Sequence, residues 1–210
     1  MTTDTLVSEC RTAGRHVVGL DAGHGVDAYG FKIWELVGKH ARTGSGVPCV
    51  IIWSSDGSQS TQFEFLTESK ALVEDVVRGL FPSDPDWSWI PSAASIDKDI
   101  KSLLALRRVW PNIMIIYCLF HLCQWLYPIL RTAALGVPDD KVDDVAFQFR
   151  SLANLPTKAL FDARWAELRA EWGQLYPSFL IILIKALFND HWKTTWPIFY
   201  LIEVFVLCLY

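Results

Sequence analysis

The chain lacks the excess of positive charge that is typical of proteins that bind nucleic acid over a broad surface. Its 210 residues include 19 lysines and arginines against 23 aspartates and glutamates, which gives a net charge of −4. Because neutralised phosphates supply much of the affinity for DNA, this balance argues against strong DNA binding over the whole surface. It leaves a local basic patch open.

The chain also lacks an uncharged apolar run of about 18 residues, the length that a transmembrane helix needs. Its longest apolar segments are residues 178–188, interrupted by Lys185, and residues 197–210, interrupted by Glu203. The first twenty residues contain charged side chains and no continuous apolar stretch, so no signal peptide is expected. We therefore expect an intracellular protein with no membrane partner.

A disulfide framework is absent as well, because the five cysteines are odd in number and lie far apart. Free thiols are the default for such cysteines inside the cell. Apolar material is abundant, with 51% hydrophobic residues and ten tryptophans. This composition is sufficient for a packed core and excludes a disordered chain. We expect Trp34, Trp53, Trp89 and Trp110 to lie in that core.

The spacing of apolar residues predicts a mixed α/β domain followed by helices. Strands are expected at residues 15–21, 29–37, 47–53, 87–96 and 112–117. Helices are expected at 61–80, capped by Ser58 or Ser60, at 99–110, and at 120–135 with a bend at Pro128. From residue 142 to 188 the pattern is helical throughout.

This order of elements matches the RNase H-like fold, a mixed five-stranded sheet in the order 3-2-1-4-5 flanked by helices. In that fold the first and fourth strands lie side by side. Asp21 ends the first expected strand and Asp97 ends the fourth. We therefore expect the two carboxylates to meet at the carboxyl edge of the sheet, where open α/β sheets place their ligand sites.

Two neighbouring carboxylates can hold divalent cations, and a pair of cations about 4 Å apart can activate water and stabilise the leaving oxygen in phosphodiester cleavage. A structural role competes with this one, because an aspartate at a strand end is often a turn former or a helix cap. Asp97 can cap the helix that begins near Asp99. Spacing alone does not decide between the two roles.

Four segments carry a resemblance to a known family. They are GLDAGHGVDAYGFK at 19–32, GVPCVII at 46–52, PSAASIDKDIKSLLALRRVWP at 91–111 and YCLFHLCQ at 117–124. In this order they resemble the first catalytic aspartate with its strand, the third strand, the second aspartate with its helix, and the Cys-x-x-His element of Mutator-like element (MULE) transposases. Gly23 departs from the family, which usually has threonine there. The resemblance covers residues 15–135 and, more loosely, the helical region to residue 196.

The resemblance implies metal-dependent cleavage and transfer of DNA strands by an Asp-Asp-Glu triad. Asp21 and Asp97 would be its catalytic, metal-binding members, with Mg²⁺ or Mn²⁺ as the cofactor. DNA would be the partner and the nucleus the compartment, with no small-molecule cofactor and with a homo-oligomer left open. His24 would meet a phosphate or sugar near the site, or stay a solvated loop side chain.

Cys118 and His121 would be signature positions near the same site. From the residues themselves we favour a structural role for both, with Cys118 packed at a strand end and His121 capping or orienting the next helix. Zinc is not expected, because a structural zinc site needs four ligands. For Asp99 we favour a helix cap over a metal ligand.

The third acid of the triad is not recognisable. Glu203 lies in the apolar segment LIEVFVLCLY, which is unlike the family segment, and Glu167 and Glu171 are expected to face solvent. We therefore expect a C-terminally truncated, transposase-derived fragment that is inactive in strand transfer. One alternative is a non-catalytic module that binds DNA or protein. The other is a different RNase H-like nuclease, which would need further acids such as Asp27 and Asp99.

The expected organisation has four parts. They are an N-terminal extension at 1–14, the RNase H-like core at 15–136, a helical insertion-like region at 137–196 and an atypical apolar tail at 197–210.

Overall fold

A computed structural model describes residues 8, 11–12, 16–23, 30–39, 45–97, 99–152 and 154–187. The described residues form two compact units, and the division between them lies after Ile115. The first unit contains most of a β-sheet and two helices, and the second contains the remaining helices.

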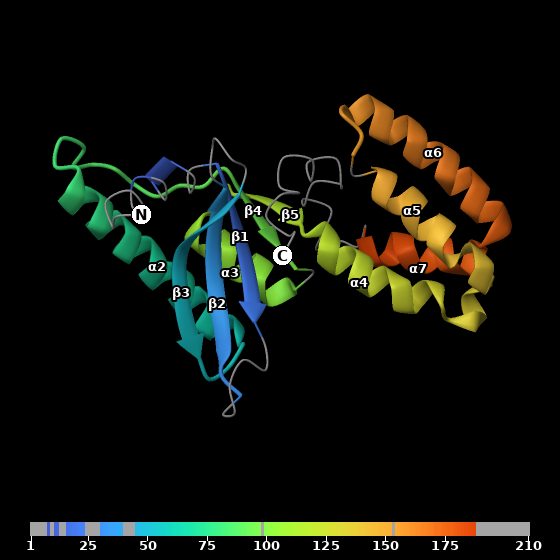
Figure 1. The fold of residues 1–210 in the computed structure, drawn as a ribbon, viewed down its shortest axis with the longest axis horizontal. Coiled ribbons are helices and arrows are strands. Elements are labelled where there is room, and N and C mark those ends of the chain that lie inside the picture. Colours follow the sequence, from blue (N-terminus) through green and yellow to red (C-terminus); the bar gives the residue numbers. More distant parts are fainter. Residues whose placement is uncertain are drawn as a thin grey trace. The chain divides into compact units, whose positions relative to one another are not determined.

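The first unit is built on a mixed five-stranded sheet in the order β3-β2-β1-β4-β5 (Figure 1). Strand β1 is antiparallel to β2 and parallel to β4, and β2 is antiparallel to β3. The predicted α/β class, the sheet order and the position of the first strand beside the fourth are confirmed. The strands are β1 (Val17–Gly23), β2 (Lys32–Lys39), β3 (Gly46–Ser54), β4 (Ala93–Ile96) and β5 (Met114–Tyr117).

Two helices, α2 (Gln59–Leu80) and α3 (Ile100–Val109), pack against each other and lie behind the sheet in Figure 1. The ring of Trp34 on β2 lies 6.4 Å from the ring of Phe65 on α2, centroid to centroid. Side chains alternate between the two faces of a strand, so every second strand residue reaches this layer. The core between sheet and helices includes Val18, Leu20, Leu36, Leu66, Ile96 and Leu106.

Both expected helix starts in this unit are capped by side chains. The hydroxyl of Ser58 accepts a hydrogen bond from the backbone N–H of Thr61 at 3.2 Å, so Ser58 rather than Ser60 caps α2. Asp99 caps α3 by accepting from the N–H of Lys101 at 3.1 Å. Such caps satisfy amide groups that the first turn of a helix leaves without a partner.

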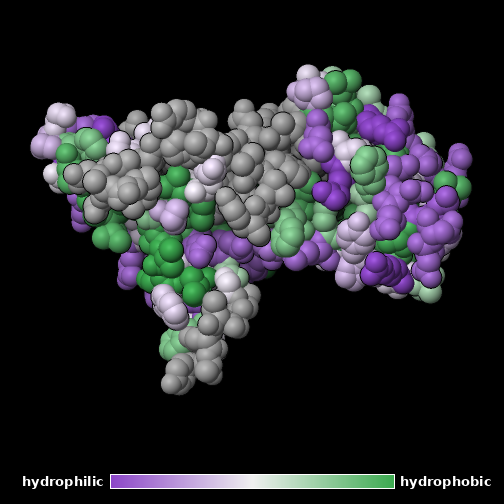
Figure 2. Space-filling model, in the orientation of Figure 1, coloured by the Kyte–Doolittle hydropathy of each residue, from purple (hydrophilic) through white to green (hydrophobic). Residues whose placement is uncertain are grey.

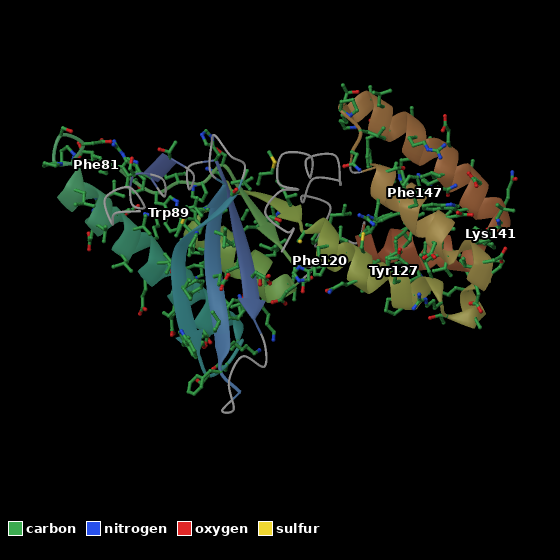
Figure 3. All side chains as sticks on the ribbon, viewed as in Figure 1. Phe81, Trp89, Phe120, Tyr127, Lys141 and Phe147 are labelled. Atoms are coloured by element: carbon green, nitrogen blue, oxygen red, sulfur yellow. The ribbon has the colours of Figure 1, made fainter. Side chains whose placement is uncertain are left out.

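The fourth strand is shorter than predicted. The pattern indicated a strand over residues 87–96, but β4 begins only at Ala93. Side chains contact the backbone of the preceding residues. The carbonyl of Trp89 (labelled in Figure 3) accepts a hydrogen bond from the indole N–H of Trp110 at 2.8 Å. The backbone N–H of Trp89 donates to the carboxylate of Glu74, also at 2.8 Å. Trp87 is 1% exposed and Trp89 is 0% exposed. The apolar residues of this segment are therefore buried although the segment is not a strand.

The face of the sheet opposite the helices carries exposed apolar side chains over β2 and β3, seen as a hydrophobic patch in Figure 2. Ile51 is 53% exposed and Trp53 is 60% exposed. The expectation that Trp53 lies in the core is therefore wrong, whereas Trp34, Trp89 and Trp110 are buried. The reason is position, because Trp53 lies on strand β3 at one end of the sheet order and alternates away from α2.

The second unit is helical, as the sequence pattern predicted. Its helices are α4 (Leu119–Leu130), α5 (Val142–Leu152), α6 (Lys158–Leu175) and α7 (Pro177–Leu187). The expected helix at 120–135 ends at Leu130, and a short 3₁₀ turn at Ala133–Leu135 closes on Gly136 with φ 76°. Glycine adopts this left-handed conformation without strain. The core of the unit includes Phe149, Phe161, Trp172 and Phe179.

Among the described residues, no helix is long and apolar enough to cross a membrane. The apolar tail at 197–210 and the N-terminal residues before Ser8 lie outside the described part of the chain.

Candidate functional site

Asp21 lies on β1 with its side chain exposed on the face opposite the helices. Its neighbours Val18 and Leu20 alternate with it and are buried, at 0% and 4% exposure. The strand continues two residues past Asp21 to Gly23, further than the sequence predicted. One carboxylate oxygen, Oδ1, accepts the N–H of Ala22 at 2.8 Å. Asp21 is therefore a strand residue that faces outward and is no turn former at a strand end.

Asp97 comes next to this position from the neighbouring strand. In the parallel β1–β4 ladder Leu20 pairs with Ile96, and Asp97 is the first residue after that pair, as Asp21 is on β1. Asp97 is exposed. Because parallel strands run in register here, the two aspartates occupy adjacent positions at the carboxyl end of β4. The structure thus brings together the two carboxylates that the sequence singled out.

An acid opposite Asp21 was not among the predicted site residues. Glu35 on β2 pairs directly with Asp21 in the antiparallel β1–β2 ladder. Residues that face each other in such a ladder point to the same side of the sheet, with their Cβ atoms about 4.5–5.5 Å apart. Only the register of the two strands reveals this neighbour, and no local sequence signal specifies that register.

Asp99 is fixed by a hydrogen-bond network between α2 and α3. Its Oδ1 caps α3, while its Oδ2 accepts from Gln62 Nε2 at 3.2 Å and from the Ser102 hydroxyl at 3.1 Å. The Ser102 hydroxyl also lies 2.8 Å from Gln62 Oε1. The structure confirms the preference for Asp99 as a helix cap, and the cap is Asp99 and not Asp97.

Cys118 and His121 belong to the second unit, whereas Asp21 and Asp97 belong to the first. Cys118 directly follows β5 and is 5% exposed, which agrees with packing at a strand end. His121 lies in the first turn of α4, and its ring contacts that of Phe120 edge to face at 5.4 Å. Burial raises the pKa of the nearby Cys123 thiol, the negative charge of a Cys118 thiolate adds to this, and Arg150 opposes it.

His24 and Asp27 lie outside the described residues, as does Glu203. Glu167 and Glu171 on α6 are exposed, as predicted, and Glu167 accepts an ion-paired hydrogen bond from Arg164 at 2.7 Å.

Asp21 and Asp97 offer carboxylate oxygens, the donor type that Mg²⁺ prefers in proteins. In the described part of the chain, no three His, Cys, Asp or Glu side chains form a group that could hold a metal ion. Mg²⁺ does not require three, because it commonly keeps several waters and binds through one or two carboxylates together with substrate phosphates. Asp21 and Asp97 supply two hard oxygen donors at an exposed edge, where water and a phosphate have access.

Two acids face each other at this edge. Asp21 pairs with Glu35, and like charges directly opposite each other in a sheet are destabilising. Comparison with known proteins adds no family to these observations: no family model matches the chain, and no curated protein matches it either.

Proposed function

We propose that the first unit is an RNase H-like core derived from a MULE-type transposase, which binds a divalent cation at Asp21 and Asp97 and uses it to engage DNA phosphates. One observation carries the proposal. The parallel pairing of β1 with β4 in a 3-2-1-4-5 sheet puts the two aspartates at adjacent positions. The four sequence segments that resemble MULE transposases support the same assignment, since both aspartates fall within them.

The roles of the residues follow from their chemistry. The carboxylates of Asp21 and Asp97 would hold Mg²⁺ or Mn²⁺ through oxygen, and both side chains are exposed, so a DNA phosphate can approach. When bound, such a cation polarises a phosphoryl oxygen and neutralises charge that develops on it. The hydrogen bond from Ala22 N–H to Asp21 Oδ1 helps to orient this carboxylate.

We propose further that this chain binds the cation without completing strand transfer. An Asp-Asp-Glu transposase needs a third acid, and Glu167 and Glu171 of the helical region face solvent on α6. The first unit would then hold metal and DNA phosphate as a remnant of the catalytic core.

The test is a Mn²⁺ titration of the purified full chain, combined with nicking of supercoiled DNA. Asp21→Asn and Asp97→Asn should each weaken Mn²⁺ binding at least about tenfold, because each removes one of the charged ligands. Asp86→Asn is the matched control, since Asp86 is an exposed carboxylate on the loop after α2. Mn²⁺ binding that survives both substitutions would overturn the site. Robust nicking abolished by Asp21→Asn would overturn the inactive assignment.

An alternative function, a non-catalytic module that binds another protein, is favoured by a different observation. Ile51 and Trp53 are more than half exposed on the open face of the sheet, and Trp53 pairs with Ile33 across the β2–β3 ladder. Exposed aromatic side chains in an apolar patch are typical of protein-binding surfaces. For a module of this kind, Asp21→Asn would leave every binding property unchanged.

A further inference from the structure

The sheet brings the chain to Asp97 but does not include it. Strand β4 ends at Ile96, and Asp97 is the first residue beyond it. The backbone of Asp97 has a further contact, because the N–H of Asp99 donates to the carbonyl of Asp97 at 2.7 Å. Whatever fixes Asp99 therefore fixes the backbone from which the Asp97 carboxylate projects.

Asp99 is tied to two helices through its side chain. Oδ1 caps α3 at Lys101, and Oδ2 receives the Gln62 amide of α2 at 3.2 Å and the Ser102 hydroxyl at 3.1 Å. The hydroxyl carries a single proton, and it also lies 2.8 Å from Gln62 Oε1. Ser102 can donate to only one of these two acceptors at a time. The Gln62 amide therefore donates to Asp99 Oδ2 whichever acceptor Ser102 uses.

Gln62 is well suited to this task. It is 1% exposed, and both hydrogens of its amide are used, one by Asp99 and one by the carbonyl of Gly57 at 3.3 Å. Its Oε1 accepts from Ser102. A buried amide with all of these partners has one orientation, because turning it over would set its oxygen against the Asp99 carboxylate and the Gly57 carbonyl.

We propose that Gln62 is a positioning residue for Asp97: its buried amide holds the Asp99 carboxylate and, through the hydrogen bond from the Asp99 N–H to the Asp97 carbonyl, aligns Asp97 beside Asp21. The inference rests on the proposed metal site. Residues that hydrogen-bond to metal ligands without touching the metal orient those ligands, and replacing them lowers metal affinity by about 10–100-fold. Gln62 acts on the ligand through Asp99 and touches no cation itself.

The experiment measures Mn²⁺ affinity of the full chain by electron paramagnetic resonance, together with amide hydrogen exchange of the metal-free protein. Gln62→Met keeps the length and volume of the side chain but removes both ends of the amide. It should weaken Mn²⁺ binding about tenfold and speed exchange of the Asp99 and Lys101 amides. Ser102→Ala removes the shared donor and should have a smaller effect in the same direction.

The matched control is Val73→Ala, because Val73 is 7% exposed on the same helix, α2, and lies outside the network. It lowers the stability of the helix packing and should leave Mn²⁺ affinity unchanged. Equal loss of affinity in Gln62→Met and Val73→Ala would show a general structural role and overturn the inference. Unchanged affinity in Gln62→Met would overturn it as well.

Failure of the inference and failure of the proposed function give different results. Binding that needs Asp21 but is indifferent to Gln62 overturns the inference and leaves the metal site standing. Binding that Asp21→Asn leaves intact overturns the metal site, and with it the role of Gln62 in aligning a metal ligand.

Discussion

Asp21 and Glu35 face each other across the β1–β2 ladder, two carboxylates on one side of the sheet. Like charges in this arrangement destabilise a sheet, and Asp97 adds a third carboxylate at the next strand. In the proposed function, Asp21 and Asp97 together hold a divalent cation.

Replacing Glu35 by Gln should stabilise the metal-free protein. The substitution removes the repulsion with Asp21 and keeps the size of the side chain, so we expect a gain of about 0.2–1 kcal/mol in the free energy of unfolding. Urea denaturation in the presence of a chelator measures it. Glu64→Gln, at an exposed position on α2, is the control and should change little. A loss of stability in Glu35→Gln would show that Glu35 makes favourable contacts and does not repel Asp21.

A pH-dependent contribution to stability is expected from Glu74. Burial alone would raise the pKa of its carboxyl, but hydrogen bonds from Lys70, Ser88 and the backbone of Trp89 outweigh burial and lower the pKa below the usual 4.5. A carboxyl whose pKa is lower in the folded state stabilises the fold above its unfolded pKa. This stability is lost as the pH falls through the folded value.

The measurement compares the wild-type chain with Glu74→Gln in urea between pH 7 and pH 3. At pH 7 the variant should be less stable by about 1–3 kcal/mol, because charge-assisted hydrogen bonds are lost at a site only 8% exposed. Below about pH 4.5 the difference should narrow, since the wild-type carboxyl becomes protonated too. A difference that stays constant over this range would contradict the assignment.

The indole of Trp110 should contribute to stability through its N–H as well as its bulk. Trp110 is 4% exposed and donates to the carbonyl of Trp89 at 2.8 Å. Trp110→Phe leaves that carbonyl without its donor and opens a small cavity, so a loss of about 2–3 kcal/mol is expected. Trp53→Phe is a matched control at a 60% exposed position and should stay within about 0.5 kcal/mol of wild type. Comparable losses in the two variants would show that Trp53 is buried in solution.

The sequence predicted the helix caps because these depend on local signals, and it predicted the sheet order because the order of the elements matches a known fold. Ser58 and Asp99 precede amphipathic segments, and capping needs only the few residues around a helix start. The adjacency of Asp21 and Asp97 followed from the order of the elements, since that order determines which strands are neighbours.

Other features depend on tertiary contacts that no local pattern reveals. The run from Trp87 to Ser92 has the composition of a strand, but Glu74 and Trp110 hold its backbone in another conformation. Glu35 became visible only through the register of β1 with β2, and Gln62 only through a hydrogen bond to a residue 37 positions away. Nothing in the sequence around Asp99, the cap of α3, or around Ser102 indicates a contact with Gln62.

The central claim is that Asp21 and Asp97 bind one cation together, and a double-substitution cycle of Mn²⁺ affinity tests it most directly. Asp21→Asn, Asp97→Asn and the double variant are compared with the wild-type chain. Two ligands of one ion form a unit, so the double variant should lose little more affinity than either single variant. Losses that multiply in the double variant, or single variants that bind Mn²⁺ as the wild-type chain does, would contradict the account.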